Sequence, residues 1–419
     1  MMGGGMSVET ETEQDLARGA GSPIRGRRLR QAPAMAALES PSFRRFFGPQ
    51  ALSMAGRFVQ TAVIGYLVYD VTGSNFLLGL LSFMQMVPQL LLAPFVGVAV
   101  DRFDRRRILA AQLSVQALGL FALAGLASLD VLAVPMIAVI VVIMGIANAF
   151  AYPASSSLLP SLVPMSALQS ANAINSMMGN LTRIIAPWIA GRLIDISGIT
   201  AALLFGAGMY VPAAGMMLLV PLIAAAMPVT AAGGPLQPAA APSVRRDIGE
   251  AIAYIRTNRL SRSALANDIA PYLFGLSHIA LLPAVAKDTL GGDASTLGLL
   301  YSVAGAGAML GTLGAGLLTG RGLRGPTIWT SLIGFGVGLL IVAMGSGQSL
   351  VLTGLFIAGA FQMLYIIQND TLVQTFAEDR YRGRAVAAQS MVNGLMPIGF
   401  LILGLIAELG GLRVAFATS

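Results

Sequence analysis

Cysteine is absent from this 419-residue sequence, and histidine and lysine occur once each, as His278 and Lys287. Without cysteine the chain has no disulfide, no thiol nucleophile and no zinc finger. The lysine stands in Lys287-Asp288-Thr289, outside the G-x-x-x-x-G-K-S/T frame that holds nucleotide phosphates. A protein with its own P-loop nucleotide site is therefore excluded, and we expect neither a metal nor a cofactor.

Charge is also scarce. Charged residues make up 11% of the sequence and hydrophobic residues 56%, whereas soluble proteins average about 25% charged residues. Twelve of the 45 charged residues fall within residues 1–45, which leaves 33 for the other 374. That density is too low to solvate the surface of a globular domain, so the remainder must face lipid. The sequence predicts an all-α membrane protein.

Long hydrophobic runs are abundant, and runs of about 18 residues or more can cross a bilayer as helices. We expect eleven spans, at 46–69, 77–100, 108–128, 132–153, 169–194, 201–227, 264–286, 297–320, 327–346, 351–373 and 385–408. A polar stretch separates the first six spans from the last five. The predicted organisation is a disordered cytoplasmic tail (1–45), a six-helix bundle (46–228), a cytoplasmic linker (229–263) and a five-helix bundle (264–408). The final segment (409–419) reads as the truncated approach to a twelfth helix.

Basic residues lie mostly on one side of these spans. With the N-terminus in the cytoplasm, 21 Lys and Arg residues face the cytoplasm, and only Arg192, Lys287 and Arg413 face outside. The positive-inside rule favours that orientation. The net charge of +7 is thus explained by membrane topology, and no nucleic-acid partner is expected.

Two segments of the chain are repeated. The loop segment 97–105 aligns with 316–324, so that Arg102 matches Arg321 and Arg105 matches Arg324. A second pair, 175–195 and 389–408, opens with similar tripeptides, and each ends in a glycine followed by an acidic residue, Asp195 or Glu408. Parallel repeats of about six helices, with substrate bound between them, are one known plan of membrane transporters.

The loop after the second span reads Gly97-Val98-Ala99-Val100-Asp101-Arg102-Phe103-Asp104-Arg105-Arg106-Arg107. It resembles the G-x-x-x-D-R-x-x-R-R signature of the major facilitator superfamily. Asn172, Ala186-Pro187 and Gly191 in the fifth span resemble its drug and siderophore exporter branch, which includes enterobactin-exporter-like proteins. The resemblance covers about 46–408, and it implies two bundles that rock about a central substrate.

The resemblance also implies a role for this loop, which acts in the family as a cytoplasmic latch. We expect Asp101 to be the latch acid and Arg102 and Arg105 to be its partners, with Gly97 and Arg106 belonging to the same gate. Asp104 stands where many relatives have glycine. The alternative is that the arginines only anchor the loop on the cytoplasmic side.

Arg57 and Arg183 lie near the middle of the first and fifth spans, where a charge is costly unless it faces a cavity or a partner. They predict a guanidinium-lined cavity for anionic or acceptor-rich substrates. Other polar residues within spans are further candidates for contact with substrate: Gln60, Asn148, Asn175 and Gln362. For each of these, hydrogen bonding between helices is the alternative.

Three residues are candidates for proton coupling. His278 lies in the middle of the seventh span, and histidine has an unperturbed pKa near physiological pH. Asp268 and Asp370 lie near the cytoplasmic ends of spans seven and ten. For His278 the alternative is a hydrogen-bonded packing role, and the sequence leaves all three candidates open.

These features predict a secondary transporter of a bacterial-type inner (cell) membrane. An enzyme is not expected, because no span offers a nucleophile–base pair or a cluster of metal ligands. We expect proton-coupled export of small molecules by alternating access, with the lipid bilayer, the substrate and protons as partners. Two alternatives remain. One is an importer of the same fold. The other is a truncated, non-transporting membrane protein, because the family has twelve spans and the sequence ends eleven residues after the eleventh.

Overall fold

The computed structural model describes residues 35–221, 259–318, 324–376, 389 and 391–419. Every regular element in these residues is a helix or a helical turn, and no strand occurs among them. Lipid offers no hydrogen bonds to backbone N–H and C=O groups, and a helix satisfies these groups within one segment. The prediction of an all-helical membrane protein is confirmed.

The first half of the chain begins with a short 3-10 helix, η1 (Ala36–Glu39). Ser40 then caps the next helix by accepting a hydrogen bond from the Phe43 N–H, and Pro41 occupies the first helical position, as is common at helix starts. Residues 36–39 and 41–45, which we assigned to a disordered tail, are therefore helical. The helices that follow are α2 (Pro41–Thr72), α3 (Asn75–Arg102), α4 (Arg105–Ser128), α5 (Val134–Asn148), α6 (Ala151–Leu158) and α7 (Leu168–Leu218).

α7 is 51 residues long and is broken at Gly198, where φ is 81° and ψ is 168°. Only glycine adopts that conformation readily, so the chain turns there and α7 comprises two consecutive spans. Ten stretches of the described residues are long and apolar enough to cross a membrane, and one of them is the 54-residue stretch Met165–Leu218 that contains this break. With that stretch divided at Gly198, the ten correspond to the eleven predicted spans.

The second half begins with α9 (Arg259–Ala270), so the last five residues of the predicted linker are helical. The rest of the linker that lies before them is outside the described residues. An irregular helical segment of π and 3-10 turns, Pro271–Thr289, follows. Pro271 and Pro283 lack the N–H that a regular helix needs. The remaining helices are α11 (Ala294–Leu318), α12 (Arg324–Met344), α13 (Gln348–Phe376) and α15 (Met396–Thr418).

α15 contains a second break, at Gly411, with φ of 81° and ψ of 166°. Residues 412–418 after the break are helical. They belong to the segment that we expected to approach a twelfth helix.

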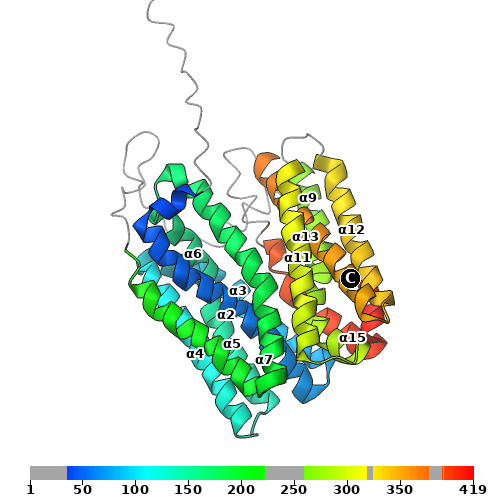
Figure 1. The fold of residues 1–419 in the computed structure, drawn as a ribbon. Coiled ribbons are helices and arrows are strands. Elements are labelled where there is room, and N and C mark those ends of the chain that lie inside the picture. Colours follow the sequence, from blue (N-terminus) through cyan, green and yellow to red (C-terminus); the bar gives the residue numbers. More distant parts are fainter. Residues whose placement is uncertain (1–34, 222–258, 319–323, 377–388, 390) are drawn as a thin grey trace, which may run out of the picture.

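The helices group into two bundles (Figure 1). In the first half α7 packs against α2 and α4, and α5 packs against α3 and α4; in the second half α13 packs against α11 and α12. The halves meet mainly where α7 lies on α11 and where α3 lies on α15. The two-bundle architecture is confirmed. We call the end where α2 stops and α3 starts the Asp195 end, and the opposite end, where α3 stops and α4 starts, the Asp104 end.

Glycines allow the two halves to approach closely at both contacts. A Cβ on Gly191 of α7 would overlap the Ala294 carbonyl oxygen of α11, and a Cβ on Gly79 of α3 would overlap the Phe400 carbonyl oxygen of α15. Gly298 and Gly404 face them from the partner helices, against the main chain of Pro187 and Asn75. Small residues at helix crossings permit such backbone contact in membrane proteins.

Candidate functional site

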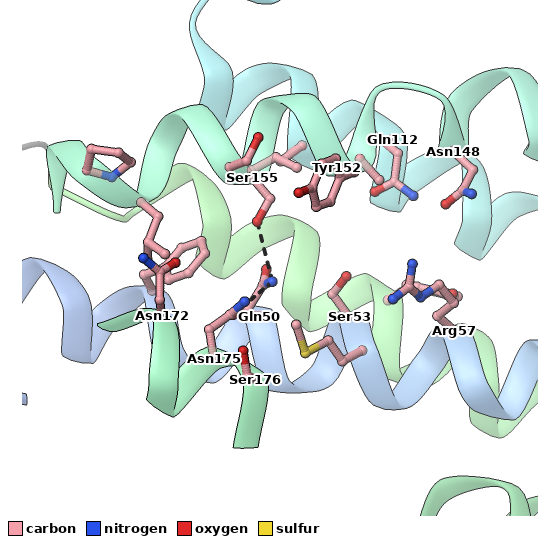
Figure 2. Close-up of a pocket in the computed structure, with 18 of the residues that line it drawn as sticks. Gln50, Ser53, Arg57, Gln112, Asn148, Tyr152, Ser155, Asn172, Asn175 and Ser176 are labelled. Atoms are coloured by element: carbon pink, nitrogen blue, oxygen red, sulfur yellow. Dashed lines mark hydrogen bonds between the residues drawn. The ribbon is translucent and has the colours of Figure 1, made fainter. Parts of the chain in front are cut away.

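A cavity of about 440 Å³ lies inside the first half, between α2, α4, α5, α6 and α7. This volume falls in the range of about 300–1,000 Å³ that is usual for small-molecule sites. Figure 2 shows polar side chains from several helices turned toward the same space. The labelled polar lining residues are Gln50, Ser53, Arg57, Gln112, Asn148, Tyr152, Ser155, Asn172, Asn175 and Ser176.

Gln50 connects the walls of the cavity. Its side-chain Nε2 lies 3.4 Å from Ser155 Oγ of α6 and 3.4 Å from Asn175 Oδ1 of α7. Other amides, Gln112 and Asn148, face the cavity from α4 and α5. Amide groups both donate and accept hydrogen bonds, so the cavity suits a ligand with several polar groups.

Of the residues predicted to contact substrate, Arg57, Asn148 and Asn175 line this cavity. Gln60, Arg183 and Gln362 do not. Gln60 is buried and accepts a hydrogen bond of 2.8 Å from the Tyr210 hydroxyl of α7, which is the helix-to-helix alternative that the sequence left open.

Sequence reasoning missed most of the lining residues, although their spacing contained the signal. Gln50, Ser53 and Arg57 recur at three- and four-residue intervals, so they share one face of α2. Asn172, Asn175 and Ser176 share a face of α7 in the same way. A polar stripe of this kind within a lipid span indicates a cavity.

Two arginines meet at one aromatic ring beside the cavity. Arg57 Cζ and Arg183 Cζ each lie 5.8 Å from the centroid of the Phe58 ring. Arg57 is exposed and Arg183 is partly buried. Neither guanidinium forms an ion pair with a described residue. Arg57 is also the single charged residue among the described residues that line the cavity.

Asp268 is the most deeply buried of the proton-coupling candidates, with 1% of its surface exposed. Its carboxylate accepts hydrogen bonds of 2.6 Å from the Tyr365 hydroxyl and 2.6 Å from Asn369 Nδ2, both on α13. Both donors are neutral, and no described cation pairs with Asp268. A carboxyl group in such surroundings is costly to ionise.

The other two candidates have different surroundings. His278 is buried, and its Nδ1 donates to the Gly275 carbonyl oxygen at 2.6 Å. The ring packs edge-on against Phe335 and Phe416, with centroids 5.9 and 6.2 Å away. This is the packing role that the sequence left open for His278. Asp370 is partly buried and accepts a hydrogen bond of 2.7 Å from Gln389 Nε2.

The loop between α3 and α4 carries the predicted latch. Asp101 and Arg102 are exposed at the end of α3 and have no hydrogen bond or ion pair with a described residue. Arg105 donates to the Ser157 carbonyl oxygen at 3.2 Å, which lies in its own half. Gly97 lies in the interior of α3, and a Cβ there would meet nothing within 4 Å.

Asp104 was not among the predicted latch residues, yet it is the acidic residue of this loop that forms an ion pair with a described residue. It caps α4 by accepting a 2.9 Å hydrogen bond from the Arg106 N–H, and it forms a 2.7 Å ion pair with the Arg106 guanidinium. These hydrogen bonds hold the pKa of the Asp104 carboxyl below its ordinary value. Arg106 also donates to the Val220 carbonyl oxygen at 2.9 Å. The N-cap preference of aspartate was the missed signal.

Acidic residues join the two halves at the Asp195 end. Asp195 at the end of the first span of α7 accepts hydrogen bonds from the N–H groups of Ala294 and Ser295, at 3.2 and 2.9 Å, and from the Ser295 hydroxyl. Glu408 of α15 accepts from the Ser74 hydroxyl at 3.2 Å and from the Phe76 N–H at 3.1 Å. Each acid thus binds the first turn of a helix of the other half, where the helix dipole favours negative charge.

Two more contacts cross between the halves at this end. Lys287 donates to Asp70 at the end of α2, with an N–O distance of 2.6 Å. The neighbouring Tyr69 hydroxyl donates to Asp288. Lys287 and Asp288 follow one another in the irregular segment before α11. The two halves are therefore joined at the Asp195 end by helix caps, an ion pair and a tyrosine hydrogen bond.

Sequence comparison finds a family of membrane secretion proteins and several named transporters. Residues 32–419 match the family described as transmembrane secretion effector. Macrolide efflux protein A of Streptococcus pyogenes is 27% identical over 380 residues, which cover 88% of this chain and 90% of that protein. The staphyloferrin A transporter of Staphylococcus aureus is 23% identical (89% and 91% covered), and the multidrug efflux pump Tap of Mycolicibacterium fortuitum is 25% identical (86% and 88%).

Solved structures agree at the level of the fold. The nucleoside transporter NupG superposes with a TM-score of 0.70 at 15% identity, over 90% of this chain and 95% of that one. A bacterial homologue of ferroportin gives 0.63 at 17% identity, over 90% and 95%. These neighbours and relatives are named as transporters or efflux proteins, and none is named as an enzyme. The chain belongs to the transmembrane secretion effector family of the major facilitator superfamily, whose members are multi-pass membrane transporters.

Proposed function

We propose that the protein is a proton-coupled exporter of small molecules that works by alternating access in the bacterial cell membrane. The joined Asp195 end is the observation that carries the proposal. Acids, a lysine and a tyrosine tie the halves together there, while the polar cavity extends to Leu159, Pro160 and Leu168 toward the Asp104 end. Contacts between the halves at one end, with a cavity that reaches toward the other, support a transporter that opens to one side at a time.

The distribution of basic residues supports a cytoplasmic N-terminus. In that orientation the Asp104 end and the linker face the cytoplasm, and the Asp195 end faces outside. The cavity then receives substrate from the cytoplasm, as an exporter requires. The efflux roles named for the relatives support the same direction of transport.

The loop at the Asp104 end is the proposed cytoplasmic latch. In this arrangement Asp101 and Arg102 are exposed at the cytoplasmic end, which is consistent with a latch that is open while the outer side is closed. In the opposite state Asp101 would pair with charges or helix ends of the second bundle. Paired groups that form in only one state shift the balance between the two states.

Asp268 is the proposed proton carrier, ahead of His278 and Asp370. Its carboxylate is buried among neutral donors, so the uncharged, protonated form is favoured whenever water is excluded. When the bundles rock and admit water, the proton can leave. His278 packs edge-on against two phenylalanines and donates to the Gly275 carbonyl oxygen, which supports it less well as a carrier.

Everted membrane vesicles with an acidified lumen test this function. The probes are a radiolabelled macrolide, radiolabelled citrate and tetramethylrhodamine, each with and without a protonophore. We expect uptake of at least one probe into vesicles that contain the protein, and we expect the protonophore to abolish it. Uptake that persists with the protonophore would contradict proton coupling. No uptake of any probe by well-expressed protein would contradict the exporter proposal.

A further inference from the structure

We propose that Arg57 and Arg183, with Phe58, bind a carboxylate group of the transported molecule. The inference rests on the proposed function, since it names the chemical class of the substrate that the cavity accepts. It starts from an unusual juxtaposition, in which two guanidinium groups share one aromatic ring and both arginines lie near the middle of their spans.

Arg57 and Arg183 carry like charges and both lie against the Phe58 ring, so each charge disfavours the other. Charged groups at this depth in a bilayer normally pair with an opposite charge or face water. No described carboxylate pairs with either arginine. An anion bound by both arginines would therefore offset the repulsion between their charges and supply the negative partner that each lacks.

Three other basic residues of the described chain have oxygen partners. Arg105 bonds the Ser157 carbonyl oxygen, Arg106 pairs with Asp104, and Lys287 pairs with Asp70. These three lie near the ends of the spans, where water also reaches them. Arg57 and Arg183 differ from these three, because they lie in mid-span and have no such partner among the described residues. We infer that a bound molecule supplies their partner.

A carboxylate fits this place better than a phosphate group. Guanidinium is planar and donates two parallel hydrogen bonds to a carboxylate. Phosphate sites usually add backbone N–H groups from the start of a helix. Arg57 and Arg183 instead lie in the interiors of α2 and α7, where backbone N–H groups already serve the helix. Phe58 contacts both guanidinium groups by cation–π interaction.

The rest of the cavity complements this charge with neutral polar groups. Gln112 and Asn148 face the same space as Arg57 in Figure 2, and Gln50 and Ser53 share its face of α2. No acid lines the cavity among the described residues. The predicted ligand therefore combines a carboxylate at the Arg57 end with hydroxyl, ether or amide groups along the cavity.

A matched pair of dyes tests the site by direct binding to purified protein in detergent. Tetramethylrhodamine has a benzoate carboxylate, and its methyl ester differs only in the masking of that group. Fluorescence anisotropy gives both affinities. We expect the acid to bind at least about tenfold more tightly than the ester, the difference that one charge-assisted hydrogen-bond pair produces. Equal affinities, or no binding of the acid, would overturn the proposal.

Variants locate the carboxylate contact. Arg57→Gln and Arg183→Gln should each weaken binding of the acid by about tenfold and leave the ester unchanged. Arg192→Gln is the matched control, because this arginine lies on α7 near the Asp195 end and away from the cavity. If Arg183→Gln does not fold, as judged by gel filtration, Arg57→Gln carries the test, since its side chain is exposed to the cavity. Discrimination that survives in Arg57→Gln would overturn the assignment.

Two further measurements complete the test. One distinguishes a carboxylate ligand from a phosphate ligand, and the other distinguishes failure of the site from failure of the proposed function. Acetate should displace the acid dye from the wild-type protein at lower concentration than inorganic phosphate does, and the reverse order would overturn the choice of a carboxylate. The binding assay uses no proton gradient. Loss of carboxylate binding with intact proton-driven uptake would refute the site alone, whereas carboxylate binding without uptake would refute the proposed function alone.

Discussion

Asp195 and Glu408 occupy corresponding positions in the two halves, and each accepts hydrogen bonds from the first turn of a helix in the other half. Both acids stand four residues after a glycine at the helix contact and three residues before a glycine with φ of 81°. The internal repeat of the sequence thus produces two equivalent links between the bundles at one end of the molecule.

We predict that these two acids hold the Asp195 end closed. A hydrogen bond to a charged group contributes about 1.5–3 kcal/mol. The hydrogen bonds of Asp195 and Glu408 belong at the lower limit, because both side chains are exposed. Asparagine and glutamine keep an acceptor oxygen and lose only the charge, so part of each contribution remains. The double variant Asp195→Asn with Glu408→Gln should raise the fraction of molecules open at this end by about tenfold. Ser302→Cys provides the reporter. Ser302 is buried on α11 and donates to the Ile184 carbonyl oxygen of α7, and the native chain has no other thiol.

Labelling of Ser302→Cys in intact cells by a membrane-impermeant maleimide measures the opening. The rate should rise in the double acid variant. Asp130→Asn serves as the control, because Asp130 is an exposed acid in the turn between α4 and α5. A labelling rate that does not change in the double variant would show that the acids do not hold this end closed.

The glycine contact between α7 and α11 supports a second prediction. A methyl group at position 191 would overlap the Ala294 main chain, and overpacking of this kind costs about 1–3 kcal/mol. Gly191→Ala should therefore reduce transport by about tenfold or more, with little change in the amount of protein in the membrane. Gly208→Ala, on the same helix with open space around it, should transport normally. Equal transport by the two variants would mean that close contact there is not needed.

The third prediction concerns the buried acid of α9. Asp268→Asn should keep the hydrogen-bond geometry with Tyr365 but remove the proton site. Binding of a proton and of substrate at coupled sites is reciprocal, with effects of about 5- to 150-fold. We expect proton-driven uptake to fall by about tenfold or more, while exchange of substrate without a gradient continues. Proton-driven uptake at the wild-type rate in Asp268→Asn would move the proposed role to Asp370 or His278.

The helices could be predicted from the sequence because hydrophobic runs of membrane length have few alternatives. The predicted spans 77–100 and 108–128 lie within or close to α3 and α4. Helix ends were less well placed, since lipid contact does not specify where a helix stops. The start of α2 at Pro41 depends on the Ser40 cap, and the division of α7 depends on a single glycine at position 198.

The candidate site was predicted only in part. Arg57 stood out because charge in a span is rare, and it does line the cavity. Gln60 is just as polar, but it faces Tyr210. A single sequence does not reveal which face of α2 meets α7. Only the packing of the helices therefore shows which polar residues of α2 line the cavity and which bond a neighbouring helix. The same limit hid the bonds between Asp195 and α11, which join residues about one hundred positions apart.

The last prediction tests the cap at the start of α4. Asp104 accepts a hydrogen bond from the Arg106 N–H and pairs with its guanidinium, and the two side chains are 29% and 27% exposed. Loss of an N-cap costs about 1 kcal/mol, and a partly exposed ion pair adds up to about 1 kcal/mol. Asp104→Ala should therefore lower the apparent thermal midpoint of the protein in detergent at pH 7, and Asp104→Asn should lower it less, because Asn still caps the helix.

The dependence on pH follows from the direction of the Asp104 pKa. In the folded protein Arg106 lowers the pKa of the Asp104 carboxyl below its ordinary value of 3.8. The charge of Asp104 therefore contributes its full stabilisation above pH 3.8. The contribution is lost as pH falls through the lowered pKa. The difference in thermal midpoint between the wild type and Asp104→Asn should therefore be constant from pH 7 to 5 and shrink below 3.8. A difference that stayed constant below that pH would show that the charge of Asp104 does not stabilise the loop.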